Sequence, residues 1–281
     1  MSLDLGAVGR QVGPAVVEWS STDAILYALG VGAGQLDPAA ERELTTENSN
    51  GVTQQILPTF AIVLSQRAGL AVDIGQVDRA KVVHGEQKLT LHQPLSVEGS
   101  ASLTARVSGI FDKGSGALIR TTIDAVDPAS GAPLFTSEGA SFLRGAGGFG
   151  GPKEAPADWP EPHREPDVSV AVPTRTDQAL LYRLSGDRNP LHSDPVLATR
   201  AGFDRPILHG LCTFGITARA ALQALQVDPG ALASISGRFT KPVLPGETFT
   251  VSLWKDGDRT IYRTADGDGD AVLDRGVLTT R

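Results

Sequence analysis

The segment "YRLSGDRNPLHSDPVLATRAGF", residues 182–203, places three side chains capable of chemistry within the six positions 187–192. Asp187 offers a carboxylate that can accept a proton, and His192 offers an imidazole that can hold or return one. Asn189 lies between them and offers a donor and an acceptor to a bound water. If a turn brings these groups together, they can grip and polarise a single water molecule.

The same segment also suits an ordinary turn. Gly186, Asp187, Asn189 and Pro190 are all residue types that turns favour, and Asp and Asn can hydrogen-bond their own backbone. In that reading His192 simply fills a gap. The residue types alone therefore leave a structural turn and a catalytic turn both open.

Two other kinds of site are disfavoured. One Asp, one Asn and one His supply few good zinc ligands, with His209 the only further candidate nearby, so we expect no metal. A Ser–His–Asp triad would need Ser185 or Ser193, and neither serine lies in a Gly-x-Ser-x-Gly elbow.

A place for developing negative charge is predicted at Gly210. The segment "ILHGLCTFGITARAALQALQ", residues 207–226, repeats apolar and small residues at three- and four-residue steps, which predicts a helix packed closely on a sheet. Gly210 lies near its N-terminus, where free N–H groups and the helix dipole favour an anion, and glycine lets a ligand approach. These are the requirements of an oxyanion hole. Alternatively, Gly210 only permits tight helix–sheet packing.

Neighbouring residues receive structural interpretations. We expect His209 to be a satisfied core histidine and Cys212 to be inert within an apolar helix face. A shorter helix is predicted over residues 194–202, with Asp194 as N-cap, Pro195 at the first helical position and Gly202 as the stop.

The chain reads as two similar α+β halves. Residues 144–167, "RGAGGFGGPKEAPADWPEPHREPD", are crowded with Gly, Pro and charges and lack periodicity, which indicates a linker. We therefore predict an N-terminal domain over residues 1–145, a linker over 146–166 and a C-terminal domain over 167–281. Each half is expected to wrap one buried helix with an antiparallel sheet.

An internal repeat supports duplication. Aligning Tyr27 with Tyr182 also pairs several Ala and Leu positions of "STDAILYALGVGAG" and "RTDQALLYRLSGDRNP". The alignment puts Gly32 and Gly34 opposite the acid and amide of the C-terminal turn, and Asp37 opposite its histidine. Only the C-terminal half can therefore form the acid–imidazole pair. The loss motivates the hypothesis that the first half leaves a roomier tunnel for a long or bulky ligand.

Composition limits the functional class. The 281 residues carry a net charge of -7 without a conspicuous Lys/Arg cluster, so nucleic acid and an anionic membrane surface are not expected as partners. The single cysteine excludes an internal disulfide and a thiolate-rich metal cluster. No stretch approaches the ~20 apolar residues of a membrane span, and the first residues do not resemble a secretory signal. We expect a soluble cytoplasmic protein.

The run "YRLSGDRNPLHSDPVLATRAGFDRPILHGLCTFG" resembles the signature of the MaoC-like, or type 2, (R)-specific enoyl-CoA hydratases, which have a hot-dog fold. The first half resembles the degenerate N-terminal unit of their two-domain, double hot-dog members through "TTENSNG", "LPTFAIV", "VHGEQKLTLHQPL" and "DKGSGAL". The resemblance implies a pseudo-dimer of two hot-dog units within one chain. It covers nearly the whole chain, and the linker is its least matched part.

The resemblance also implies residue roles. Asp187 and His192 would hold the water with help from Asn189, and the Gly210 N–H would stabilise the thioester oxyanion. The acyl-CoA would be seated by His84, Gly85, Lys113 and Phe239.

The implied reaction is reversible hydration of a trans-2-enoyl-CoA to an (R)-3-hydroxyacyl-CoA, with no cofactor other than the CoA of the substrate. A hot-dog acyl-CoA thioesterase and a non-catalytic acyl-CoA-binding module are the alternatives. The sequence leaves open the acyl chain, the direction, and whether CoA or an acyl-carrier protein bears it. A pseudo-dimeric monomer and a homodimer are both compatible with two units in one chain.

Overall fold

Ten strands form one continuous antiparallel sheet in the computed structural model, which describes residues 2–78, 81–155 and 159–281. Five strands come from the N-terminal half. In sheet order they are β2 (Gln11–Trp19), β5 (Gly99–Asp112), β6 (Gly116–Val126), β7 (Pro133–Arg144) and β4 (Val82–Leu91). The C-terminal half continues with β9 (Leu232–Phe239), β12 (Ala271–Thr280), β11 (Arg259–Ala265), β10 (Thr248–Asp256) and β8 (Val168–Pro173).

The strand order has an internal two-fold symmetry. Read inward from either edge, β2-β5-β6-β7-β4 matches β8-β10-β11-β12-β9, and the two series meet where β4 pairs with β9. The predicted duplication is therefore visible in the topology. The sequence predicted two separate sheets, whereas the β4–β9 pairing joins them edge to edge, which leaves neither central strand exposed. At this seam Leu89 lies opposite Ile235, and both are fully buried.

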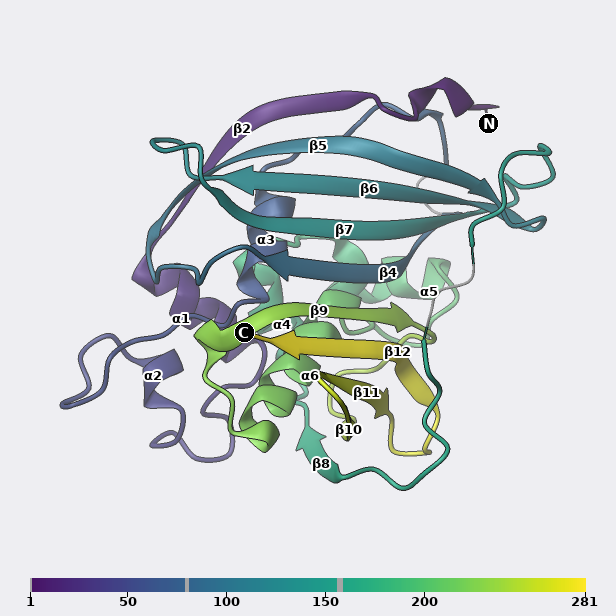
Figure 1. The fold of residues 1–281 in the computed structure, drawn as a ribbon. Helices are drawn as coiled ribbons and strands as arrows, with labels where there is room; N and C mark the ends of the chain where they lie inside the picture. Colours follow the sequence, from purple (N-terminus) through teal and green to yellow (C-terminus); the bar gives the residue numbers. More distant parts are fainter. Residues whose placement is uncertain (1, 79–80, 156–158) are drawn as a thin grey trace.

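Helices cover one face of the sheet (Figure 1). In the C-terminal half α6 (Gly210–Leu225) lies against β8, β9 and β10, whereas the N-terminal half has only the short α3 (Phe60–Arg67) against β7. The expectation of one buried helix per half holds, but the first is half as long. The remaining helices are α1 (Ser21–Gly30), α2 (Arg42–Thr45), α4 (Gln178–Tyr182) and α5 (Pro195–Arg200), with 3₁₀ turns η1 (Leu5–Ala7), η3 (Arg183–Ser185), η4 (Pro190–His192) and η5 (Pro229–Ala231). A two-stranded ribbon pairs β1 (Ser2–Leu3) with β3 (Gly75–Gln76).

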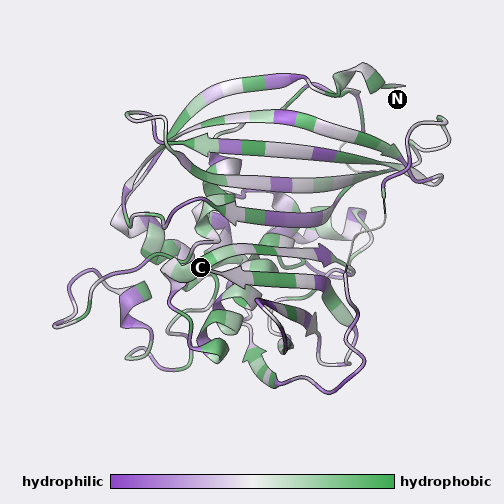
Figure 2. Cartoon of the chain, in the orientation of Figure 1, coloured by the Kyte–Doolittle hydropathy of each residue, from purple (hydrophilic) through white to green (hydrophobic). Residues whose placement is uncertain are grey.

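The halves share one core. Strands show alternating hydrophobic and polar bands (Figure 2), and their apolar residues join those of α1, α3 and α6 in a single cluster that spans both halves. Tyr27 and Tyr182, the aligned positions of the repeat, are both buried with ring centroids 6.2 Å apart. The repeat thus packs against itself at the centre of the molecule.

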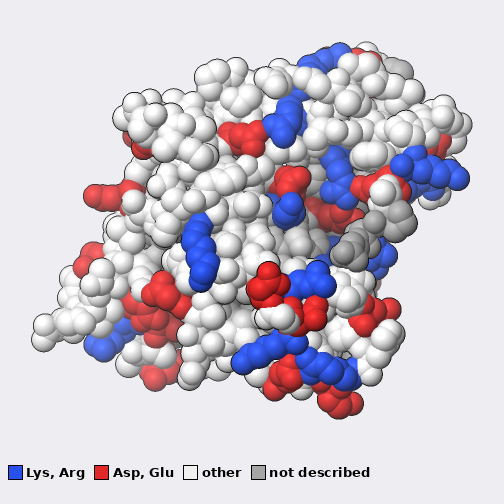
Figure 3. All heavy atoms as spheres, viewed as in Figure 1, with Lys and Arg blue, Asp and Glu red and all other residues white. Residues whose placement is uncertain are grey.

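The segment between β7 and β8 forms no helix or strand in its described residues. Its first part folds back on the β5–β6 turn, where the Asp112 carboxylate accepts the N–H groups of Gly148 and Gly150. Figure 3 shows Lys and Arg interspersed with Asp and Glu over one face, without the large positive field that nucleic-acid binding favours. Within the part of the chain that the structure describes, no helix combines the length and apolar character that a membrane crossing requires.

Candidate active site

The acid–imidazole segment forms a compact turn after α4 and η3. Gly186 has φ 153°, which favours glycine, and a Cβ there would lie 3.2 Å from Arg67 Cγ. Asn189 then caps η4, because its side chain accepts the Leu191 N–H, and Pro190 begins that turn. These residues do build a turn, as the structural reading of the sequence proposed.

This turn also brings the side chains capable of acid–base chemistry close together. Possible ligand atoms of Asp187, His192 and His209 all lie within 4.8 Å of one another. Asp187 is partly exposed, whereas His192 and His209 are 9% and 1% exposed. The predicted encounter of Asp187 with His192 is therefore present, and His209 joins them. Asn189 is exposed, and its backbone N–H donates to Asp187 Oδ1 at 3.1 Å.

Backbone carbonyls fix how the two imidazoles are protonated. His192 Nδ1 donates to the Ile207 carbonyl at 2.8 Å, so its Nε2 keeps a lone pair. His209 Nε2 donates to the Asp187 carbonyl at 3.2 Å, and its buried Nδ1 has no partner among the described residues. The two rings stack with centroids 3.8 Å apart and an interplanar angle of 28°.

Burial keeps both histidines neutral. It lowers the pKa of His192 below 6.5, although the hydrogen bond to Ile207 and the charge of Asp187 act in the opposite direction. Burial, with the charge of His192, lowers the pKa of His209 to about 4. A neutral His192 beside a carboxylate can accept a proton from water, which is the chemistry expected of the turn.

Gly210 is the first residue of α6, and His209 precedes it as N-cap. The N–H groups of Cys212 and Thr213 donate to the His209 carbonyl, whereas those of Gly210 and Leu211 lie at the start of the helix without an intrahelical acceptor. A Cβ at Gly210 would lie 3.2 Å from the Phe239 ring. Gly210 therefore fits both predictions from the sequence: it permits close packing, and its amide is free to bind an anion.

The N-terminal half contributes His84 beside this helix start. Its ring lies 5.0 Å from that of Phe239, and the charge of Asp187 acts on it to raise its pKa, although burial lowers that pKa overall. Gly85 forms a bulge where β4 pairs with β7. Three of the four predicted substrate-seating residues, His84, Gly85 and Phe239, thus gather near Gly210 across the seam between the halves.

Lys113 lies apart from this cluster, in the β5–β6 turn. Its Nζ forms an ion pair with Glu154 Oε2 at 3.0 Å. The register places this turn at the same end of the sheet as the start of β4 and the end of β9. A role for Lys113 in the site would therefore concern the part of a ligand that reaches toward this end of the sheet.

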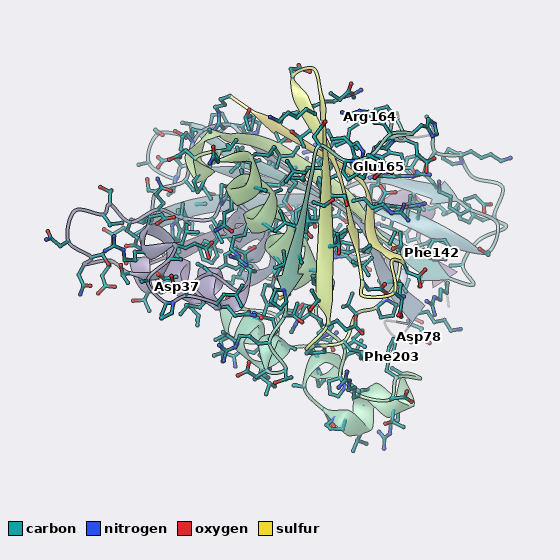
Figure 4. All side chains as sticks on the ribbon, turned by 90° about the horizontal axis from the view of Figure 1, so that it is seen from below. Asp37, Asp78, Phe142, Arg164, Glu165 and Phe203 are labelled. Atoms are coloured by element: carbon teal, nitrogen blue, oxygen red, sulfur yellow. The ribbon has the colours of Figure 1, made fainter. Side chains whose placement is uncertain are left out.

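The first half carries no second site at the aligned positions. A Cβ at Gly32 would lie 3.2 Å from Gln35 and 3.3 Å from Arg219, which pairs with Glu41 at 2.8 Å. This largely buried ion pair occupies the space next to Gly32, so the exchange to glycine does not by itself open a tunnel there. In Figure 4 Asp37 lies on the N-terminal segment, away from Phe203, which follows α5.

Two residues make contacts at the site that the sequence did not predict. His209 was expected to be a satisfied core residue, but one of its ring nitrogens is unpartnered and it stacks on His192. Arg67 is distant from the acid–imidazole turn in the sequence, yet its Nε donates to the Ser185 carbonyl at 2.6 Å, next to that turn. The adjacency of His209 to Gly210 was a usable signal, whereas nothing local in the sequence points to Arg67.

Fold and site together define the molecule as a double hot-dog with one acid–imidazole turn, placed in its C-terminal unit. Comparisons with known proteins agree. The family model for the MaoC like domain matches residues 158–275, and that for the MFE-2 hydratase 2 N-terminal domain matches residues 17–145.

Curated relatives and solved structures match the chain over nearly its full length. A 3-hydroxyacyl-thioester dehydratase Y of Mycobacterium tuberculosis is 45% identical over 99% of this chain and 97% of that protein. A peroxisomal enoyl-CoA hydratase 2 of Arabidopsis thaliana is 38% identical over 88% of this chain and 85% of that protein. The crystal structure of a MaoC-like dehydratase from Phytophthora capsici has a TM-score of 0.88 at 27% identity, covering 99% of this chain and 98% of that chain. The chain therefore belongs to the MaoC-like, hydratase 2 family in its two-domain form, as the sequence motifs predicted.

Proposed function

We propose that this chain catalyses the reversible addition of water to a trans-2-enoyl-CoA, giving an (R)-3-hydroxyacyl-CoA. The observation that carries the proposal is the convergence of Asp187 and a neutral His192 next to the free amide of Gly210. Family membership supports hydro-lyase activity, because the relatives that match over most of their length are named as hydratases and dehydratases.

The geometry suggests a division of labour. Asp187 and the Nε2 lone pair of His192 accept hydrogen bonds from the two O–H groups of one water. As the water oxygen bonds to C3, one proton passes to the pair, and the electrons of the C2–C3 double bond move toward the thioester oxygen. The Gly210 N–H stabilises that oxygen. Collapse of the enolate then takes a proton from the pair to C2, so that H and OH have been added and the pair is restored.

The remaining predicted residues seat the substrate. His84, Gly85 and Phe239 lie where the thioester and pantetheine arm would pass the start of α6, and Asn189 holds Asp187 through its backbone N–H. Lys113 would meet a phosphate of CoA. We propose medium to long or bulky acyl chains, although the Arg219–Glu41 pair fills the space next to Gly32.

The reaction is tested with purified protein and trans-2-enoyl-CoA substrates of several chain lengths. Loss of the enoyl absorbance without free thiol is expected, and the product should be oxidised by an (R)-specific but not an (S)-specific 3-hydroxyacyl-CoA dehydrogenase. Release of free CoA would instead indicate a thioesterase. Binding without turnover would indicate a non-catalytic acyl-CoA-binding module. A strict preference for a four-carbon chain would contradict the proposed substrate range.

Location and assembly belong to the same proposal. We place the activity in the cytoplasm, whereas the name of the Arabidopsis relative places that protein in peroxisomes. Because one chain supplies both hot-dog units and pairs them through β4 and β9, a homodimer is not needed to complete the site. Cell fractionation and light scattering on the purified protein test these two points.

A further inference from the structure

Arg120 on β6 is a cation that neither the sequence motifs nor the proposed reaction accounts for. It shares a carboxylate with Lys113: Arg120 Nε and Lys113 Nζ contact the two oxygens of Glu154, with the Lys113 contact at 3.0 Å. Arg120 Nη2 also contacts Glu86 Oε2 at 2.6 Å. Two cations from different parts of the sheet thus converge on a single anion.

The shared anion comes from the linker rather than from the sheet. Glu154 follows the segment that folds back on the β5–β6 turn, where the Asp112 N–H donates to the Pro152 carbonyl. Its side chain is only 16% exposed, compared with 38% for Lys113 and 33% for Arg120. Burial acts to raise the pKa of Glu154, but the hydrogen bonds from Arg120 and Lys113 outweigh it and lower that pKa. The site therefore favours an oxyanion held by two cations.

This anion site is connected to the acid–imidazole site along β4. Glu86, which holds Arg120, offers its backbone carbonyl to His84 Nε2 at 2.9 Å. The His84 ring contacts Phe239, which in turn packs against the start of α6. Register places the Lys113 turn, the start of β4 and the end of β9 at one end of the sheet, the right-hand end in Figure 1. A thioester held at Gly210 would extend its carrier toward this end.

We propose that Arg120 is a second phosphate-binding residue for the CoA portion of the substrate, acting with Lys113, and that Glu154 is an intramolecular stand-in for the phosphate. The proposal rests on the proposed acyl-CoA hydration. A CoA phosphate carries more than one acceptor oxygen and can replace both oxygens of Glu154, with Arg120 supplying directed donors and Lys113 a point charge. Displacement of Glu154 leaves Lys113 and Arg120 facing Glu86 alone, so the local net charge becomes positive.

The test compares two substrates that differ only in the carrier: a trans-2-enoyl-CoA and the same enoyl thioester of pantetheine, which lacks phosphates. Arg120→Gln should raise KM for the CoA thioester about tenfold or more, because a charge-assisted hydrogen bond contributes roughly 1.5–3 kcal/mol. Its kcat, and both constants for the pantetheine thioester, should stay near wild type. Glu154→Gln should lower KM for the CoA thioester severalfold, because a competing anion is removed.

Arg106 provides the matched control. It lies on the neighbouring β5 and pairs with Asp124 on the same sheet, so Arg106→Gln removes an equal charge away from the proposed subsite and should leave both KM values unchanged. An unchanged KM of Arg120→Gln for the CoA thioester would overturn the proposal. An equal loss on both thioesters would also overturn it, since a purely structural role does not distinguish carriers.

Two further measurements distinguish failure of the phosphate site from misfolding of a variant and from failure of the proposed function. Glu154→Gln leaves Arg120 in place, so it decides the stand-in role even if Arg120→Gln does not fold, and an unchanged KM there would contradict that role. Calorimetric titration of the wild type and both variants with CoA itself measures phosphate binding without turnover. If neither thioester is hydrated, the proposed function fails, while weaker CoA binding by Arg120→Gln would still support the phosphate site.

Discussion

The imidazole rings of His192 and His209 stack with centroids 3.8 Å apart, and the more deeply buried ring, His209, donates its Nε2–H to the backbone carbonyl of Asp187. One histidine thus touches both members of the proposed catalytic pair. It also stands as N-cap of α6, directly before Gly210. The acid, the base and the oxyanion site are linked through a residue that takes no part in the proton transfers themselves.

Replacement of His209 should therefore reduce turnover. His209→Phe keeps an aromatic ring against His192 but removes the hydrogen bond to Asp187, which at about 1–2 kcal/mol predicts a five- to thirtyfold loss in kcat. His209→Gln retains a donor and should recover part of the rate. Steady-state kinetics check both variants. Wild-type kcat in His209→Phe would show that the stacked histidine does not position the pair.

Substitution of the catalytic pair itself should reduce kcat more than substitution of His209. Asp187→Asn and His192→Ala should each lower kcat about 10²–10⁴-fold, since each removes a positioned acid–base group. The first half supplies a matched control, because Asp37 aligns with His192 in the repeat but is exposed. Asp37→Asn should retain full activity. Hydration rates close to wild type in either C-terminal variant would refute the mechanism.

Stability should fall on mild acidification. The pKa of His192 lies below 6.5 and that of His209 near 4, so between about pH 4 and 6.5 the unfolded chain binds more protons than the native one. The charged groups that act on these rings are Asp187 and, for His209, also His192 and Arg183, and the burial of both rings outweighs the favourable charge of Asp187. The stabilisation is complete above pH 6.5 and is lost as pH decreases through this window.

Urea unfolding at several pH values measures this loss of stability. His209→Phe should flatten the dependence between pH 6.5 and 4, because the group with the larger shift is gone. A free energy of unfolding that stays constant across this window in the wild type would contradict the neutral, buried state of the histidines.

Arg67 connects the N-terminal half to the catalytic turn. Its Nε donates to the Ser185 carbonyl, and its Nη1 pairs with Asp23 at 2.8 Å. Arg67→Met should lower stability by about 1–3 kcal/mol, since both acceptors lose a partner, and should lower kcat by loosening the turn. Arg175→Met, which removes an exposed pair with Asp177, should cost less than ~1 kcal/mol. Thermal unfolding and kinetics on both variants would show whether the first half supports catalysis; equal effects would count against it.

Dialysis against EDTA should leave the hydration rate unchanged. Asp187, His192 and His209 have the spacing of a metal-ligand group, but the proposed reaction needs the carboxylate and one imidazole nitrogen to hold the protons of water. Elemental analysis of the purified protein should find no stoichiometric zinc. Loss of activity on dialysis and recovery with added Zn²⁺ would require a different mechanism.

Much of this molecule was determined by sequence. The repeat around Tyr27 and Tyr182, the N-cap Asp194 and the positive φ of Gly202 after α5 all depend on local residue types, so they were predictable from spacing and capping rules. The acid–imidazole turn was predictable for the same reason, because Gly186, Asn189 and Pro190 fix its backbone within a few residues.

Only the tertiary structure decided which distant groups complete the site. The β4–β9 pairing brings His84 of one half to Phe239 of the other, and the linker returns Glu154 to Lys113 and Arg120. These contacts depend on strand register and on how the chain folds back, which no local pattern encodes, because pairing energies between strands are set by the whole sheet. The sequence determined the chemistry of the turn, and the join between the two halves determined what surrounds it.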